Sequence, residues 1–174
     1  MKVNLTMIPT EGLKLTFLKE GAALRELVAP AGELDFVLEP VHGSFTVYRS
    51  HNAVLVEGRV ETTVELACSR CLELVHLNVA TDFHYTFLPA EGMPQKDREL
   101  TAEDVELGYY EGESIDLAPI IFEQIVLQIP MKVLCREDCR GLCPCCGANL
   151  NVTACHCPTE AGDPRFMILK KLKH

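Results

Sequence analysis

The chain has 174 residues, of which 48% are hydrophobic, 24% charged and 6% aromatic, which excludes a disordered tail or a fibre and suits one domain, or one domain with a small appendage. The net charge is −9, but residues 91–116 hold nine acidic and two basic side chains, whereas residues 132–174 hold seven basic and four acidic ones, so the average surface does not favour a polyanionic partner. No apolar run approaches the roughly 20 residues that span a bilayer, and no hydrophobic segment follows the first residues as in an export signal, so we expect a soluble, cytoplasmic protein that binds no membrane.

The N-terminal part contains two candidate strands and one candidate helix. Residues 2–8 and 13–19 are expected to be strands, and Glu11-Gly12 supplies turn residues between them. Residues 22–28 suit a short helix that ends near Pro30.

Residues 44–88 are typical of an antiparallel meander of short strands, because apolar and polar residues alternate along them. His51-Asn52 and Glu57-Gly58 supply turn residues between candidate strands. Pro89 should end the last strand, since proline cannot donate a hydrogen bond to a ladder.

Residues 89–114 combine proline and glycine with a dense set of acidic residues. This composition favours a solvated excursion rather than a packed element. Within it, residues 105–110 are a candidate edge strand.

A helix is predicted after this excursion. Asp116 is a suitable N-cap, and Pro119 is tolerated in the first turn because the amides there lack intrahelical partners. The helix should run to about Gln128, end before Pro130 and cover the sheet. The apolar residues that we expect it to bury are Leu117, Ile120, Ile121, Phe122, Ile125, Val126 and Leu127.

Phe83, Tyr85 and Phe87 lie on one face of the last meander strand. Nucleic-acid-binding sheets use aromatic residues in this way to stack on bases. Because no Lys or Arg lies among them, we expect these rings to pack beneath the predicted helix instead.

Nine cysteines are the strongest chemical signal in the composition. Their number is odd and no export signal is seen, so metal binding explains them better than structural disulfides in a reducing cytosol. Cys68-Ser69-Arg70-Cys71 lies between two strand-like segments. This places a Cys-x-x-Cys pair at the tip of a β-hairpin, where both thiolates can point at one ion.

The other seven cysteines follow the predicted helix. Cys143-Pro144-Cys145-Cys146-Gly147 has the form of a zinc knuckle, in which the proline stiffens the loop and Gly147 permits a positive φ. We predict a first Zn²⁺ site that closes a compact local loop at low entropic cost. Its four ligands are Cys143, Cys146, Cys155 and Cys157.

The remaining cysteines allow a second site. Cys68, Cys71, Cys135 and Cys139 could bind a second Zn²⁺ and join the sheet to the C-terminal segment, which leaves Cys145 over. Cys135 or Cys139 could instead belong to the first site, and Cys135 could be a small buried residue without a ligand role. Cys68 and Cys71 could also form a redox dithiol, although such motifs favour a helix N-terminus over a hairpin.

No motif predicts catalysis. The six histidines form no His-Glu-x-x-His sequence, and no Gly-x-Gly-x-x-Gly or Walker sequence occurs. A metal ion with four cysteine ligands has no open position for a reacting water. We therefore predict that the protein is not an enzyme and has no small-molecule substrate.

Four motifs in this order resemble the YceD family, and the resemblance extends from about residue 55 to the C-terminus. They are Cys68-x-Arg70-Cys71-Leu72, Ile115-Asp116-Leu117, the run from Cys139 and Gly141 through Cys146 to Asn149-Leu150-Asn151 with Cys155-x-Cys157, and Asp163-Pro164-Arg165-Phe166. The resemblance implies a non-enzymatic bacterial protein, with relatives in plant plastids, that is needed for normal accumulation of large-subunit ribosomal RNA.

Two charged segments are candidate partner surfaces. Basic residues of the C-terminal part could contact the phosphates of pre-ribosomal RNA, and four of them are Arg140, Lys170, Lys171 and Lys173. The three lysines also sit where cations complement the end of a short helix predicted from Asp163-Pro164 to Leu172. The acidic segment with Glu103, Asp104 and Glu106 suits a basic ribosomal protein of the large subunit, which we favour as the partner.

The sequence thus predicts an α+β protein with an antiparallel sheet that could close like a barrel, covered by one helix, and a cysteine-rich, zinc-binding C-terminal segment. Residues 1–134 form the sheet and its helix, and residues 135–174 form the zinc-binding segment. The expected function is that of an accessory factor in ribosome biogenesis. The alternatives are a thiol-redox or metal-handling protein and an RNA-processing enzyme without a recognisable motif.

Overall fold

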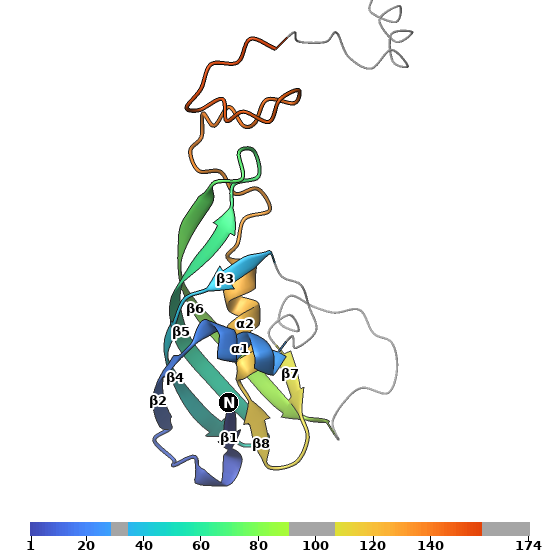
Figure 1. Ribbon diagram of the computed structural model, residues 1–174. Helices are drawn as coiled ribbons and strands as arrows, with labels where there is room; N and C mark the ends of the chain where they lie inside the picture. Colours follow the sequence, from blue (N-terminus) through green and yellow to red (C-terminus); the bar gives the residue numbers. More distant parts are fainter. Residues whose placement is uncertain (29–34, 91–106, 158–174) are drawn as a thin grey trace, which may run out of the picture.

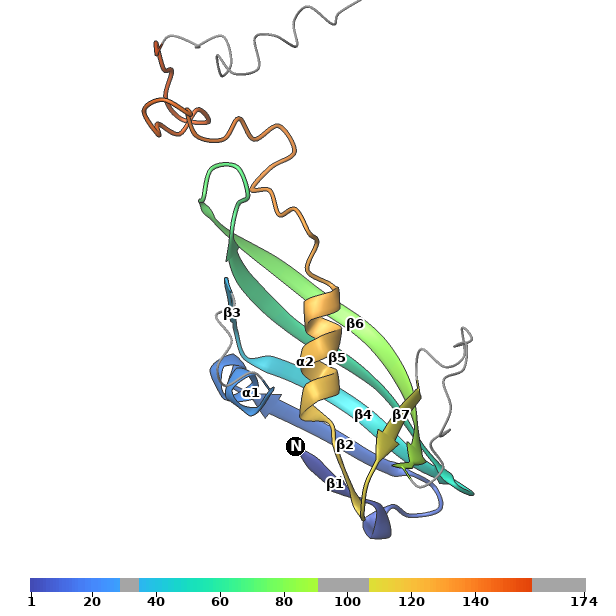
Figure 2. The ribbon, with the colours of Figure 1, turned by 90° about the vertical axis from the view of Figure 1, so that its right-hand side faces the viewer.

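The computed structural model describes residues 1–28, 35–90 and 107–157. Two helices, α1 (Gly21–Val28) and α2 (Ala118–Leu127), lie over one face of a twisted sheet (Figures 1 and 2). The strands are β1 (Lys2–Asn4), β2 (Leu13–Lys19), β3 (Phe36–Leu38), β4 (Val41–Ser50), β5 (Ala53–Ala67), β6 (Leu74–Pro89), β7 (Leu107–Tyr110) and β8 (Ser114–Asp116). Neither described helix is long and apolar enough to cross a membrane.

The main sheet has the strand order β2-β4-β5-β6-β7, and β3 pairs with β5 outside this path. β5 and β6 form one long hairpin, paired from Val54 opposite Phe87 to Ala67 opposite Leu74. β6 and β7 are parallel, whereas the other pairs are antiparallel. The long connection between the two parallel strands permits this arrangement, because parallel neighbours need a crossover.

The core lies between the sheet and the two helices. Side chains alternate between the two faces of a strand, so a period of two in apolar residues buries one face. From α1, Leu24 is fully buried, and α2 contributes Ile121 and Ile125, which are fully buried as well. The matching residues of β5, each at most 2% exposed, are Val54, Val56, Val60 and Val64.

The aromatic residues of β6 belong to this core. Phe83 and Phe87 are buried, and Tyr85 packs against the same cluster. The Nε2 group of Gln124 in α2 donates a hydrogen bond to the Tyr85 hydroxyl at 3.0 Å. This confirms the prediction that these rings pack beneath the helix.

The opposite face of the sheet is polar. Arg59 of β5 forms ion pairs with Glu61 at 2.8 Å and with Asp82 of β6 at 3.0 Å.

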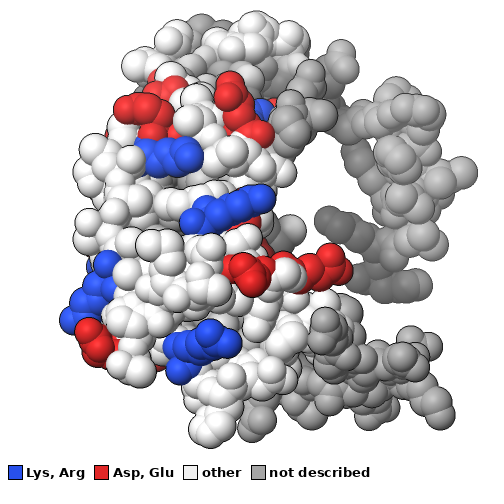
Figure 3. All heavy atoms as spheres, turned by 90° about the horizontal axis from the view of Figure 1, so that it is seen from below, with Lys and Arg blue, Asp and Glu red and all other residues white. Residues whose placement is uncertain are grey.

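Viewed from below, the molecule carries cationic and anionic side chains side by side rather than a patch of one sign (Figure 3). On this view of the described residues, no single-sign surface marks a binding face.

The expected barrel-like closure under a single helix is wrong in two respects. β2 and β7 end the strand path of the described residues and do not pair with each other, so the sheet is open. The face that a barrel would turn inward is covered by both α1 and α2, so the sheet buries its apolar side chains without closing. The sheet is also mixed rather than wholly antiparallel, because of β7.

The predicted turn at Glu57-Gly58 is wrong, since β5 runs through it without interruption. Gly58 lies on the core face, where an added Cβ would come within 2.8 Å of Phe45 Cβ and of Phe83 Cζ. The glycine therefore makes room for the side chains of Phe45 and Phe83 on the neighbouring strands. The predicted turn at His51-Asn52 is present, and His51 has a φ of 48° there.

Three further details concern element ends. The strand expected at 2–8 covers only β1 and is followed by a 3₁₀ turn, Leu5–Met7. Leu127, expected to be buried, is 65% exposed at the end of α2. Asp116 Oδ1 accepts a hydrogen bond from the Ala118 N–H at 3.0 Å, although Leu117 is the N-cap residue itself. The helix expected from Asp163-Pro164 onward lies outside the described residues.

Candidate metal centres

The β5–β6 hairpin positions the first pair of cysteines. β5 ends at Ala67 and β6 begins at Leu74, so Cys68 and Cys71 lie in the connecting turn at the hairpin tip, as predicted. The turn is held by two backbone hydrogen bonds, from the Cys68 N–H to the Glu73 carbonyl at 2.8 Å and from the Leu72 N–H to the Cys68 carbonyl at 3.0 Å. Leu72 has a φ of 62°, in the left-handed region.

The segment after α2 runs to this tip, as Figure 1 shows. Two backbone hydrogen bonds join them: Ser69 N–H to the Val133 carbonyl at 2.8 Å, and Leu142 N–H to the Arg70 carbonyl at 3.1 Å. The Arg70 guanidinium adds a hydrogen bond to the Cys139 carbonyl at 2.6 Å. These contacts bring a second pair of cysteines against the first.

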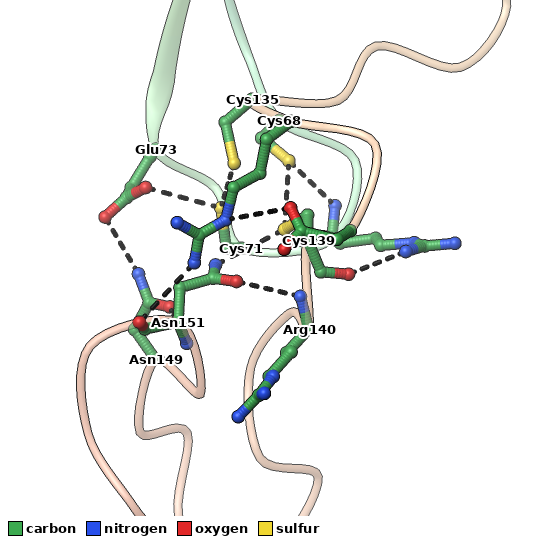
Figure 4. Close-up of polar contacts among 11 residues, drawn as sticks. Cys68, Cys71, Glu73, Cys135, Cys139, Arg140, Asn149 and Asn151 are labelled. Atoms are coloured by element: carbon green, nitrogen blue, oxygen red, sulfur yellow. Dashed lines mark hydrogen bonds and ion pairs between the residues drawn. The ribbon is translucent and has the colours of Figure 1, made fainter.

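The first group of thiols, which we call the tip group, consists of Cys68, Cys71, Cys135 and Cys139 (Figure 4). All four sulfur atoms lie within 4.8 Å of one another. The Sγ atoms of Cys68 and Cys139 are 3.8 Å apart, and those of Cys71 and Cys135 are 3.5 Å apart. Three of the four side chains are buried, and Cys135 is half-buried.

The second group, which we call the knuckle group, consists of Cys143, Cys146, Cys155 and Cys157. Its sulfur atoms also lie within 4.8 Å of one another, and Cys155 Sγ is 3.4 Å from Cys143 Sγ and 3.5 Å from Cys146 Sγ. Gly147 has the positive φ expected from the sequence, 72°, and its N–H donates to the Cys143 carbonyl at 2.8 Å.

Cys145 is exposed and belongs to neither group. The structure therefore brings together the same two sets of four cysteines that the spacing suggested. It also places Cys135 and Cys139 at the hairpin tip rather than with the knuckle, which the sequence left open.

Both groups fit a tetrahedral metal ion with four thiolate ligands. Zinc–sulfur bonds of about 2.3 Å in a tetrahedron place the sulfur atoms about 3.8 Å apart. The measured distances of 3.4–3.8 Å are near this value and far from the roughly 2.05 Å of a disulfide. All nine cysteines are free thiols, so each group could hold one metal ion.

The electrostatics of the tip group also favour a cation. Burial opposes ionisation of Cys68, but backbone N–H donors from Arg70 and Cys71 outweigh it and lower the pKa of this thiol to about 6. The Glu73 N–H favours the Cys71 thiolate, yet burial and the neighbouring Cys135 and Cys68 sulfurs raise the pKa of Cys71 to about 12. One thiol thus ionises readily while another resists, because four adjacent thiolates repel one another without a positive ion.

The knuckle group shows the same division. Backbone N–H donors of Cys146 and Cys145 lower the pKa of Cys143 to about 6. Neighbouring thiols, above all Cys155 and Cys146, raise the pKa of Cys157. A bound cation would stabilise all four thiolates together.

Four residues around the tip group have roles that the sequence analysis did not assign. Arg70 connects the hairpin to the C-terminal segment, as described above. The Glu73 carboxylate lies 3.7 Å from Cys71 Sγ and accepts a hydrogen bond from Asn149 Nδ2 at 2.8 Å. Asn151 Nδ2 donates to Cys139 Sγ at 3.3 Å (Figure 4). These four residues lie close in sequence to the cysteines of the two motifs, and this closeness was the sequence feature that could have pointed to their roles.

The predicted partner-binding residues are only partly placed. The Arg140 N–H donates to Asn151 Oδ1 at 2.8 Å beside the tip group (Figure 4). The others, Glu103, Asp104, Glu106, Lys170, Lys171 and Lys173, lie outside the described residues.

These observations define a class of protein: a mixed sheet covered by two helices, with two four-cysteine groups that could bind metal ions. Residues 56–173 match the family model described as large ribosomal RNA subunit accumulation protein YceD. The chain therefore belongs to the YceD family.

Curated proteins of bacteria and plants are similar to this chain, and the plant relative carries the family's name. An uncharacterized protein of Mycobacterium tuberculosis is 32% identical over 92% of this chain and 67% of its own length, and one of Mycobacterium leprae is 31% identical over 72% and 55%. The large ribosomal RNA subunit accumulation protein YCED homolog 1, chloroplastic, of Arabidopsis thaliana is 28% identical over 77% and 49%. The chain thus spans between about half and two thirds of the length of these relatives. No solved structure matches it.

Proposed function

We propose that this protein is a non-enzymatic accessory factor in the accumulation of large-subunit ribosomal RNA, and that it acts by binding. The observation that carries the proposal is the presence of two four-cysteine groups, one of them formed where the segment after α2 is hydrogen-bonded to the hairpin tip. Four thiolates complete a tetrahedral shell, which suits a structural metal ion rather than a catalytic one. The family membership supplies the biological process.

The metal in our proposal is Zn²⁺, one ion in each group. A set of four thiolates with two short sequence spacings is the usual donor set of structural zinc in a cytoplasmic protein. In this proposal the tip group fastens residues 135–174, the zinc-binding segment, to residues 1–134, the sheet and its helices. The ions hold this segment in a structure that it is too short to form alone.

We further propose that the partner is a basic protein of the large ribosomal subunit. The acidic segment around Glu103, Asp104 and Glu106 carries most of the net charge of the chain. The excess of three positive charges in residues 132–174 is reduced by the negative charge of zinc-bound thiolates. Electrostatic complementarity therefore favours a basic partner over RNA.

Crosslinking in cells, followed by identification of the captured protein and RNA, tests this choice. Reversal of Glu103, Asp104 and Glu106 to Lys should reduce capture of a ribosomal protein and slow its association, while RNA affinity stays unchanged or improves. A matched control reverses three exposed acidic residues elsewhere: Glu20 between β2 and α1, Glu26 of α1 and Glu57 of β5.

A direct RNA contact would give a different result. If Arg140, Lys170, Lys171 and Lys173 each bind a phosphate, log affinity should fall with log salt at a slope of roughly −0.7 per contact, or near −3 in all. Submicromolar RNA affinity that collapses when the lysines are changed to Gln, with no effect of the acidic reversals, would replace the protein partner with RNA.

The alternative functions are distinguished by other measurements. A redox or metal-handling protein should show accessible thiols and a reversible Cys68–Cys71 disulfide in a thiol titration. Our proposal expects that the thiols of the two groups react only after the metal is removed, whereas the exposed Cys145, which belongs to neither group, reacts in both states. Cleavage of ribosomal RNA by the purified protein would show that it is an enzyme.

A further inference from the structure

We infer that the two cysteine groups are thermodynamically linked: the loop that the knuckle group closes supplies Asn149 and Asn151, which hold the tip group in its ligand geometry. The inference rests on the proposed binding of metal ions by both groups. It assigns a positioning role to the two asparagines and predicts that each ion strengthens binding of the other.

Asn151 is the direct contact between the loop and the tip group. Its Nδ2 donates to Cys139 Sγ at 3.3 Å, and its Oδ1 accepts from the Arg140 N–H at 2.8 Å. The Asn151 side chain thus forms hydrogen bonds with both the sulfur of Cys139 and the backbone N–H of the next residue. A hydrogen bond of this kind orients a thiolate ligand and offsets part of its negative charge.

Asn149 makes the second connection, through the hairpin. Its Nδ2 donates to Glu73 Oε1 at 2.8 Å, and the other oxygen of that carboxylate lies 3.7 Å from Cys71 Sγ. The Asn149 Oδ1 accepts from the Asn151 N–H at 2.9 Å, which fixes the two asparagines relative to each other. Together they join the loop to the Cys139 sulfur and to Glu73, the hairpin residue beside Cys71.

Both asparagines lie in the loop between Cys146 and Cys155, two ligand-type residues of the knuckle group. The loop is short and is tied back by hydrogen bonds from the Cys143 N–H to the Ala148 carbonyl at 2.8 Å and from the Leu150 N–H to the Gly141 carbonyl at 2.9 Å. An ion in the knuckle group would restrict this loop further and so lower the entropy lost when the asparagine contacts form.

The backbone adds a further connection. The Leu142 N–H donates to the Arg70 carbonyl at 3.1 Å, and Gly141 has a φ of 75° where an added Cβ would stand 3.0 Å from that same oxygen. The residues between Cys139 and Cys143 are therefore packed against the hairpin tip. Because binding free energies are reciprocal, an ion in the tip group should favour the knuckle group by the same factor.

Cobalt titration of the full chain tests the linkage, because Co²⁺ in a four-thiolate site absorbs visible light. Two single-site proteins are needed, C146S/C155S for the tip group and C68S/C71S for the knuckle group. Independent sites predict that the unaltered chain follows the sum of the two single-site curves. If the sites are linked, the affinity of the unaltered chain for Co²⁺ should be about tenfold higher than the affinity that this summed curve gives. Loss of a hydrogen bond to a metal ligand has an effect of this size.

The asparagine variants identify the route. N149A/N151A should weaken the intact chain until its curve equals the sum of single-site curves measured with the same two substitutions. Asn78→Ala, an exposed asparagine of β6 on the polar face, is the matched control and should leave the linkage intact. Far-UV circular dichroism of each variant checks that the sheet is folded.

The outcomes separate this inference from the proposed function. Two occupied sites whose curves sum would overturn the linkage and leave the metal proposal standing. Linkage that survives N149A/N151A would overturn the role of the asparagines. Failure of every folded protein to bind Co²⁺ would overturn both the linkage and the metal proposal.

Discussion

Leu72, at the hairpin tip, combines a left-handed backbone with an exposed side chain. Its φ is 62° and its exposed fraction is 65%. A β-carbon in this region costs about 1–2 kcal/mol, and an exposed leucine recovers little of that cost through burial. The backbone conformation is imposed by the turn that points Cys68 and Cys71 at each other.

We therefore expect Leu72→Gly to raise the free energy of unfolding by about 1 kcal/mol, since glycine adopts this φ without a steric cost. Leu72→Ala is the control, because it removes the same exposed side chain and keeps the β-carbon. Urea unfolding of the metal-loaded proteins makes the comparison. Equal or lower stability of the glycine variant relative to the alanine variant would contradict this account.

At Gly58, in the middle of β5, a side chain should destabilise the protein, whereas at Leu72 its removal should stabilise it. An added Cβ would come within 2.8 Å of Phe45 and Phe83, so Gly58→Val should overpack the core and lower the free energy of unfolding by about 1–3 kcal/mol. The same substitution at the exposed neighbour Glu57 should change it by no more than about 0.5 kcal/mol. Similar urea midpoints for the two variants would show that the rings move aside freely.

At the scale of elements, the long β5–β6 hairpin carries the candidate site away from the core. The helices cover the sheet, and the hairpin tip projects beyond them to meet the C-terminal segment (Figure 2). The sulfurs of the tip group form a cluster of their own with Leu134, Leu142 and Val75, and Val75 is the residue of this cluster that also packs against the main core. Loss of a metal ion should therefore affect the tip and the segment before the sheet.

Cys146→Ser tests this separation. Removal of one ligand of the knuckle group should speed amide hydrogen exchange within residues 139–157, because the local structure depends on the ion. Amides of β4 and β5 should remain protected, since their core lies elsewhere. Complete loss of cooperative unfolding of the sheet in this variant would show that the proposed boundary between residues 134 and 135 is wrong.

At the scale of the whole molecule, eight of nine cysteines fall into two groups, each with the sulfur spacing of a tetrahedral ion. The sheet, the hairpin tip and the C-terminal segment then form one connected structure through side chains far apart in sequence. The metal content of the purified protein is the simplest measure of whether this arrangement is used.

Elemental analysis of protein purified under reducing conditions without chelator should find close to two zinc ions per chain, one for each four-cysteine group. Acidification should release them, because protons compete with the ion for thiolates. Without a metal ion the pKa values of Cys68 and Cys143 are already lowered to about 6, and a bound cation lowers the pKa of a thiol further, so release should require a pH below 6. Less than roughly one third of an equivalent of zinc would contradict the expected four-ligand sites.

Much of this protein follows from local sequence features. Helix α2, strand β2 and the end of β6 at Pro89 were predicted closely, because side-chain periodicity and proline act within a few residues. The placement of Cys68 and Cys71 at a hairpin tip had the same origin. The knuckle group followed from short spacing, since nearby residues close a loop at low entropic cost, whereas the tip group was one of the pairings that the sequence left open.

Only the tertiary structure decided the rest. A turn was predicted at Gly58, but the strand is continuous there, and the glycine instead accommodates Phe45 and Phe83 of the neighbouring strands. The parallel β7, the open sheet and the place of Cys135 beside Cys71 each depend on segments distant in sequence. Such contacts form when long loops close around a shared core, and no local pattern of residues specifies which distant surfaces meet.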